Sequence, residues 1–141
     1  MKTSYLWIST LLMLFALQAN AQTKLSWTTL AKLTFEAKGS ESGEVPVFGE
    51  ELKALDGELV LIEGFMLPLT VDNNRFVLSR YPFYNCYFCG NAGRETVIEL
   101  KPIEEDWEFD IDDQVKIQGK LKLVADEEGL IFELLEAKEL K

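Results

Sequence analysis

The sequence predicts an all-β, mainly antiparallel protein: a small five-stranded OB-like barrel with an N-terminal extension and at most one short helix. Five apolar, strand-like segments follow residue 57, and turn sequences or loops separate them. Two of these segments are long and each contains one internal glycine, Gly64 or Gly119. A glycine permits the bulge or bend that a long strand needs in a small barrel. Segment 103–113 is too polar for a convincing helix, and an open antiparallel sandwich is the alternative architecture.

Residues 1–21 have the pattern of a secretory signal peptide. Lys2 gives a positive start, an apolar run extends from Tyr5 to Leu17, and Ala19-Asn20-Ala21 is a small-residue cleavage site. The run is thirteen residues long, whereas a membrane-spanning helix needs about 20. We therefore expect cleavage after Ala21, a periplasmic or secreted protein, and no transmembrane anchor after cleavage.

Residues 22–45 are expected to form an N-terminal extension with a flexible loop, and residues 46–141 the barrel domain. In the extension, segment 24–35 mixes helical and strand-like apolar spacing, so a short helix and an edge strand both fit. Segment 38–44 is polar and contains two glycines, which is typical of a flexible loop. Segment 50–55 predicts one or two helical turns that end at the following Asp-Gly pair.

The strand predictions depend on apolar content and on alternation. The fourth strand is the clearest, because its apolar residues from Val115 to Leu123 fall on one face at a spacing of two. Turn sequences at 71–74 and 126–129 separate two pairs of strands. In chain order, the predicted strands are 58–67, 75–80, 96–100, 114–123 and 130–135.

Composition excludes several classes of function. The chain has 141 residues, with 14 Lys and Arg against 24 Asp and Glu, for a formal charge of −10. Because it has no histidine, a histidine-based catalytic triad, a His-ligated zinc site and a haem-type His ligand are excluded. The negative charge repels polyphosphate, so nucleic acid is not an expected partner.

The two cysteines define the candidate functional site. Cys86 and Cys89 lie in a loop, residues 81–95, of which five of fifteen residues are aromatic. Long ordered loops tend to be functional, and the aromatic side chains predict packing on the barrel. Two thiolates at this spacing can bind one soft metal ion, zinc or copper. Zinc requires further ligands, for which Glu95, Asn85, Asn91 or a second subunit are the candidates, whereas Cu(I) accepts two thiolates.

Two other interpretations of Cys86 and Cys89 stay open. An exported protein can hold them as a structural disulfide, which would make the domain an interaction module. A thiol–disulfide oxidoreductase is the third interpretation, although the helix that follows a thioredoxin-type pair is missing. No Ser or carboxylate constellation suggests hydrolysis, so we identify no catalytic residue and do not expect an enzyme.

Three further features have ordinary structural explanations. The acidic stretch 104–113 is compatible with a calcium site but lacks the pattern of an EF-hand loop, so a solvated acidic face is the better interpretation. The loop aromatics are capable of stacking on bases, but packing is favoured. Surface ion pairing is favoured over anion binding for three cations near the loop: Arg75, Arg80 and Arg94.

The order of motifs resembles a widespread family of uncharacterised exported bacterial proteins with a small OB-like barrel. The resemblance covers about residues 46–100 and rests on Leu55-Asp56-Gly57, on Gly64-Phe65-Met66-Leu67-Pro68-Leu69 and on Cys86-Tyr87-Phe88-Cys89-Gly90. Some members are encoded near metal transporters, which implies metal binding and an envelope transporter or membrane assembly protein as partner. The family has no established chemistry to carry over.

Overall fold

The computed structural model describes residues 22–37, 43–70, 75–104, 106–125 and 129–141. The predicted signal peptide, most of the predicted flexible loop 38–44, all of the predicted turn 71–74 and most of the predicted turn 126–129 lie outside the described residues. Among those that are described, no helix combines the length and apolarity required to cross a membrane.

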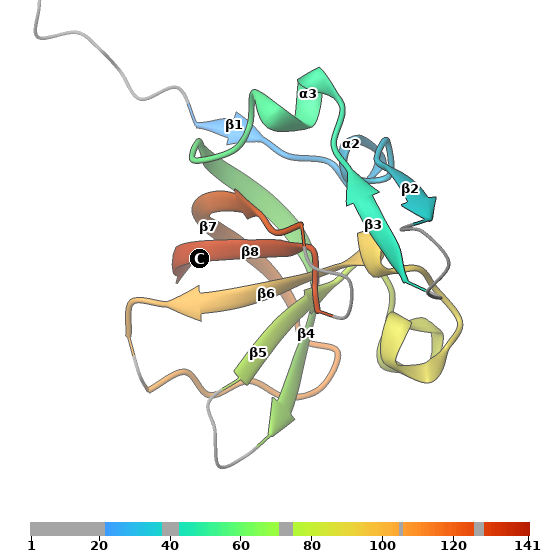
Figure 1. The fold of residues 1–141 in the computed structure, drawn as a ribbon. Coiled ribbons are helices and arrows are strands. Elements are labelled where there is room, and N and C mark those ends of the chain that lie inside the picture. Colours follow the sequence, from blue (N-terminus) through green and yellow to red (C-terminus); the bar gives the residue numbers. More distant parts are fainter. Residues whose placement is uncertain (1–21, 38–42, 71–74, 105, 126–128) are drawn as a thin grey trace, which may run out of the picture.

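Five strands form a closed barrel (Figure 1). Hydrogen bonding follows the order β4-β5-β6-β8-β7, and β7 pairs again with β4. Four of the five pairings are antiparallel and β6 with β8 is parallel. This confirms the predicted all-β, mainly antiparallel five-stranded barrel and excludes the open sandwich. The strands are β4 (Leu59–Thr70), β5 (Arg75–Ser79), β6 (Val97–Pro102), β7 (Gln114–Leu123) and β8 (Phe132–Glu139).

Strand β4 changes partner along its length. Its first part, from Leu59 to Phe65, pairs with β7, and its second part, from Phe65 to Thr70, pairs with β5. Gly64 lies just before the change, where an added Cβ would be 2.6 Å from the carbonyl oxygen of Ser79. The predicted role of Gly64 is therefore explained by close approach of β5 at the bend.

Strand β7 has the predicted alternation, because Val115, Ile117 and Leu121 are all buried. Its Gly119 faces an irregularity in β8, where the register shifts between Gln118 and Lys120. A Cβ at Gly119 would be 2.9 Å from the carbonyl oxygen of Leu135. The second internal glycine thus also marks a close approach between strands.

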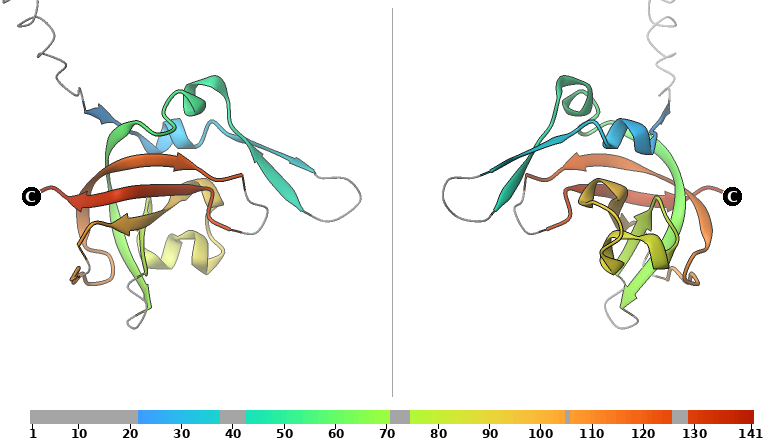
Figure 2. Two further views of the ribbon diagram at one scale, coloured as in Figure 1. Left: turned by 60° about the vertical axis from the view of Figure 1, so that its left-hand side comes forward. Right: turned by 90° about the vertical axis from the view of Figure 1, so that its right-hand side faces the viewer.

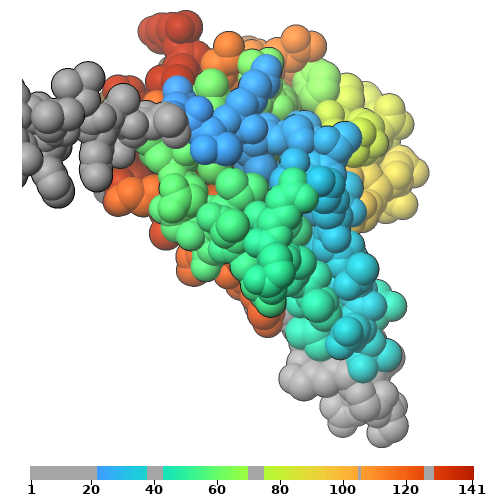
Figure 3. Space-filling view, turned by 90° about the horizontal axis from the view of Figure 1, so that it is seen from above, coloured from blue at the N-terminus to red at the C-terminus, as the bar shows by residue number. Residues whose placement is uncertain are grey.

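The N-terminal segment packs over one end of the barrel (Figures 1 and 3). Strand β1 (Thr23–Lys24) runs parallel to β4, and α2 (Trp27–Leu30) follows, capped by the Ser26 hydroxyl. Leu25, Leu30 and Leu33 belong to the main hydrophobic core. Residues of the predicted extension therefore contribute directly to the core of the barrel.

A hairpin and a second helix complete the N-terminal part. Strands β2 (Thr34–Ala37) and β3 (Glu44–Val47) pair with each other and project beyond the barrel (Figure 2). Helix α3 (Glu50–Lys53) follows and buries Leu52. The prediction allowed at most one short helix, but the described residues contain two four-residue α-helices, because segment 24–35 divides into a helical turn and a strand.

The segment between β6 and β7 contains no helix in its described residues, as predicted. Its apolar side chains attach it to the barrel instead: the rings of Trp107 and Phe109 lie 5.5 and 6.1 Å from that of Phe76. Polar residues of the same segment are mostly exposed to solvent, which fits the predicted solvated acidic face.

Candidate functional site

The candidate site lies in the loop between β5 and β6, at the side of the barrel (Figure 1). Three one-turn 3₁₀ helices divide the loop: η1 (Phe83–Asn85), η2 (Tyr87–Cys89) and η3 (Arg94–Thr96). Hydrogen bonds fix its two ends, since the Ser79 hydroxyl donates to Tyr81 O at 2.7 Å and the Thr96 hydroxyl to Gly93 O at 2.7 Å. The loop is therefore an ordered extension of the two strands.

Asp112 attaches the start of the loop to the segment before β7. Its carboxylate accepts a hydrogen bond from the Phe83 backbone N–H at 2.7 Å. Asp112 itself has a positive φ of 69°, which is uncommon outside glycine and places its side chain for this contact. Nothing in the sequence indicates this contact, because 29 positions separate the two residues.

Cys86 is the inner cysteine of the pair. Its side chain is completely buried. It belongs to a second hydrophobic cluster, separate from the main core, in which Phe83 and Tyr87 pack against Leu67, Val77, Cys86, Val97 and Leu130. A buried cysteine in such surroundings behaves as a small apolar side chain, so Cys86 holds the loop against the barrel.

Cys89 is the outer cysteine and is exposed. Its thiol donates a hydrogen bond to Phe83 O at 3.0 Å. Gly90 closes the turn with a φ of +75°, and its N–H donates to Tyr87 O at 2.9 Å. Both cysteines are free thiols in this structure.

The two thiols influence each other. Partial desolvation raises the pKa of the Cys89 thiol, and charge repulsion and hydrogen bonding with Cys86 raise this pKa further. Catalytic thiols of redox enzymes require a shift in the opposite direction, because the thiolate is the nucleophile. The arrangement therefore provides two adjacent thiols, one buried and one accessible.

The other candidate ligands gather elsewhere in the loop. Asn85, Asn91 and Glu95 line one open hollow of about 370 Å³ together with Tyr81, and neither cysteine lines it. The Asn91 amide donates to Tyr84 O at 2.7 Å, so it also supports the loop backbone. Within the described part of the chain, no group of three or more Cys, Asp or Glu residues is placed to hold one metal ion.

Two aromatic side chains of the loop point outward. Tyr84 is 80% exposed and Phe88 is 41% exposed. Each lies against a neighbouring ring that packs inward: Phe83 is 5.8 Å from Tyr84, and Tyr87 is 5.3 Å from Phe88. The expectation that the loop aromatics pack on the barrel therefore holds for the inner pair, and the outer pair is available to solvent.

The three arginines near the loop differ in their contacts. Arg75 pairs with the Glu99 carboxylate at 3.1 Å. Arg94 donates to Glu44 O at 3.1 Å, and its guanidinium lies 5.1 Å from the centre of the Phe35 ring, which links the loop to the β2–β3 hairpin. The Arg80 guanidinium lies 5.2 Å from the centre of the Tyr81 ring.

Comparisons with known proteins identify a similar fold. No protein-family model and no curated protein sequence matches this chain. The structure is similar to the crystal structure of a DUF3299 family protein, a domain of unknown function, from Pseudomonas aeruginosa, with a TM-score of 0.50 and 15% sequence identity. The match covers 86% of this chain and 97% of the other. At this identity the likeness shows the fold alone.

Proposed function

We propose that this chain is an exported, non-enzymatic accessory protein that binds a soft metal ion, zinc or copper, through Cys86 and Cys89. The observation that carries the proposal is the pair of free thiols on one turn, close enough for Cys86 to raise the pKa of Cys89. Thiolate sulfur is the ligand type that favours zinc and Cu(I). Binding an ion would replace the repulsion between two thiolates by attraction to a shared cation.

The number of side chains available to coordinate the ion favours Cu(I) over zinc. Structural zinc takes four ligands, and the described residues of this chain add no further Cys, Asp or Glu to make a group of three. Two-coordinate Cu(I) requires only the two sulfurs, whereas zinc would require ligands from a second chain. Because both thiols must lose a proton and the pKa of Cys89 is raised, affinity is expected to increase with pH.

Copper competition tests the site directly. The reduced full chain is titrated with Cu(I) in the presence of a chromogenic chelator, and we expect one ion per chain. Cys89→Ser should abolish binding without loss of fold, because Cys89 is exposed. Tyr84→Ser, at an exposed position of the same loop, is the matched control and should bind as the parent does. A parent protein that leaves all copper with the chelator, or a Cys89→Ser variant that binds equally well, would contradict the proposal.

The exported location and the partner belong to the same proposal. The signal-like residues 1–21 support a periplasmic or secreted location, and the family resemblance supports an envelope transporter or membrane assembly protein as partner. Mass spectrometry of protein from the periplasmic fraction should find a chain that begins at Gln22. A chain that retains Met1 and stays in the cytoplasm would contradict the export part.

The exposed Tyr84 and Phe88 favour a second candidate, an interaction module. In that function the loop presents two aromatic side chains to a partner, and a Cys86–Cys89 disulfide fixes the turn. The two candidates are separated by alkylating the native protein and counting the modified cysteines. Two alkylated cysteines favour the metal site, whereas the absence of alkylation at both favours the module with its disulfide. The raised pKa of Cys89 gives no support to a thiol–disulfide oxidoreductase.

A further inference from the structure

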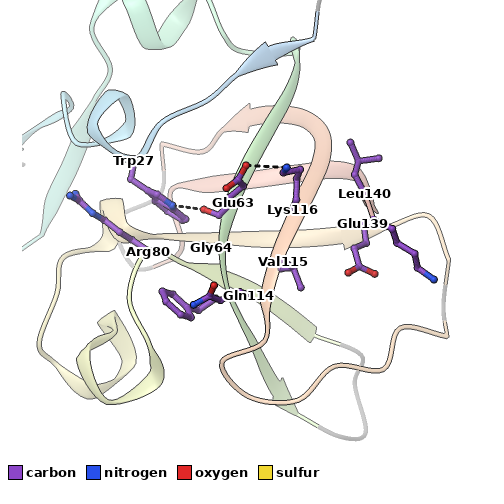
Figure 4. A pocket seen from close by; sticks show the side chains of 11 residues that line it. Trp27, Glu63, Gly64, Arg80, Gln114, Val115, Lys116, Glu139 and Leu140 are labelled. Carbon is purple, nitrogen blue, oxygen red and sulfur yellow. Dashed lines mark hydrogen bonds and ion pairs between the residues drawn. The ribbon is translucent and has the colours of Figure 1, made fainter.

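A groove on the outside of the barrel lies apart from the cysteine pair. It has a volume of about 590 Å³, which is within the range of about 300–1,000 Å³ of small-molecule sites. Its floor is formed by two cross-strand pairs of β4 and β7, Glu63 with Lys116 and Phe65 with Gln114. Trp27 and Arg80 lie on one side of this floor and residues 139–141 on the other (Figure 4).

Trp27 is held firmly in the groove. Its indole N–H donates to Glu63 O at 2.7 Å (Figure 4). Its Cζ2 lies 3.1 Å from the position that a Cβ on Gly64 would occupy, so the ring packs closely against the β4 backbone. The ring is half-buried. Together with Phe65, it gives the groove an apolar surface whose position is fixed before any ligand arrives.

Arg80 contributes a positive charge to the groove, whose lining also includes Glu139 and Lys141. Its guanidinium is stacked over Tyr81 and makes no ion pair with a carboxylate of the described residues. Lys116 differs, because its ammonium pairs with Glu63 at 3.3 Å. In a chain with a formal charge of −10, a cation without such a carboxylate, beside the Tyr81 ring, favours an anionic ligand.

We propose that this groove binds a small ligand that carries a carboxylate next to a ring with an apolar face. The planar guanidinium of Arg80 suits a carboxylate, which it can bind through two parallel hydrogen bonds. The ring packs on Trp27 and Phe65, and the Gln114 amide supplies a neutral donor and acceptor. An acidic sugar and an aromatic carboxylic acid share this chemistry. The proposal is independent of metal binding at the cysteines.

The indole N–H signals of the ¹⁵N-labelled full chain report binding. Trp27→Phe assigns the Trp27 signal, and Trp107, which packs against Phe76, is the internal control. Tri-galacturonate and N-acetyl-phenylalanine are the two probes, and a saturable shift of the Trp27 signal is expected with one or both. If only one probe shifts the Trp27 signal, the ligand belongs to the chemical class of that probe, and the proposal is supported.

Charge variants test the role of Arg80. Arg80→Gln should weaken binding of the active probe by about tenfold or more, as expected for a lost charge-assisted interaction. Lys53→Gln removes the same charge from α3, away from the groove, and should leave binding unchanged. The proposal is overturned if neither probe shifts Trp27 up to millimolar concentration, or if the two variants weaken binding equally.

Discussion

Gly64→Ala should destabilise the protein strongly, although it adds only one methyl group. The added Cβ would lie 2.6 Å from Ser79 O, 3.0 Å from Leu78 Cγ and 3.1 Å from Trp27 Cζ2. Side chains can move a few tenths of an ångström, but Ser79 belongs to the β5 backbone, which pairs with β4 at Phe65. Relief of the clash therefore requires the two strands to separate.

The expected cost follows from three contributions. Overpacking in a tight interior costs about 1–3 kcal/mol, and a weakened strand hydrogen bond adds about 1 kcal/mol. Replacing glycine by alanine also restricts the unfolded chain, which stabilises the folded protein by about 0.4–1 kcal/mol. The net loss is about 2 kcal/mol, which lowers the melting temperature by roughly 6–10 °C for a chain of this size.

Urea unfolding followed by far-ultraviolet circular dichroism measures this loss, with Gly49→Ala as the matched control. Gly49 has a φ of −70°, and an added Cβ would meet nothing within 4 Å. The control should therefore stay within about 0.5 kcal/mol of the parent. If the free energy of unfolding of Gly64→Ala also stays within that margin of the parent value, β5 does not approach β4 as closely as the structure shows. The explanation of the bend is then refuted.

Three further predictions concern the two cores and one ion-paired carboxylate. Leu30→Ala should cost about 2–5 kcal/mol because Leu30 is fully buried in the main core, and a loss below 1 kcal/mol in urea unfolding would mean that α2 is only loosely attached. Cys86→Ser should cost about 1–3 kcal/mol, since it places a hydroxyl in an apolar cluster, whereas Cys89→Ser should have little effect; equal melting temperatures would contradict this division. Burial opposes ionisation of Glu99, but Lys101 and Arg75 outweigh it and lower its pKa. The stabilisation is therefore present above the ordinary carboxyl pKa and is lost as pH falls through the lower folded value. Glu99→Gln should cost about 1 kcal/mol near neutral pH, and a difference from the parent that does not shrink on acidification would count against this pairing.

The regular alternation of apolar residues, together with the turn sequences and internal glycines, made the barrel predictable from sequence. The apolar positions of β7 from Val115 onward have a period of two, and burial follows it. The glycines at 64 and 119 were expected to mark bulges or bends, and both lie where another strand approaches closely. Strand ends were less predictable: the last strand was expected at 130–135 but runs from Phe132 to Glu139. A register shift opposite Gly119 and a positive φ of 52° at Glu136 interrupt the alternation there.

Contacts between distant segments were not predictable. The Asp112–Phe83 hydrogen bond joins a loop to a segment 29 positions away. Spacing indicated that Cys86 and Cys89 share a turn, but it did not indicate that one is buried and the other exposed. That difference depends on the cluster around Cys86, whose members come from β4, β5, β6 and the segment before β8. Local pattern therefore placed both cysteines on one turn, and tertiary packing determined the burial of each thiol.

Gly64 connects the barrel to the groove. The absence of a side chain at this position allows β5 to approach β4, and it also allows the Trp27 ring to pack against the β4 backbone. The same segment supplies Leu25 and Leu30 to the core, so the position of Trp27 depends on the packing that stabilises the fold. A groove whose aromatic wall is fixed in this way loses little conformational entropy when a ligand binds. The N-terminal segment therefore contributes both to stability and to the proposed binding surface.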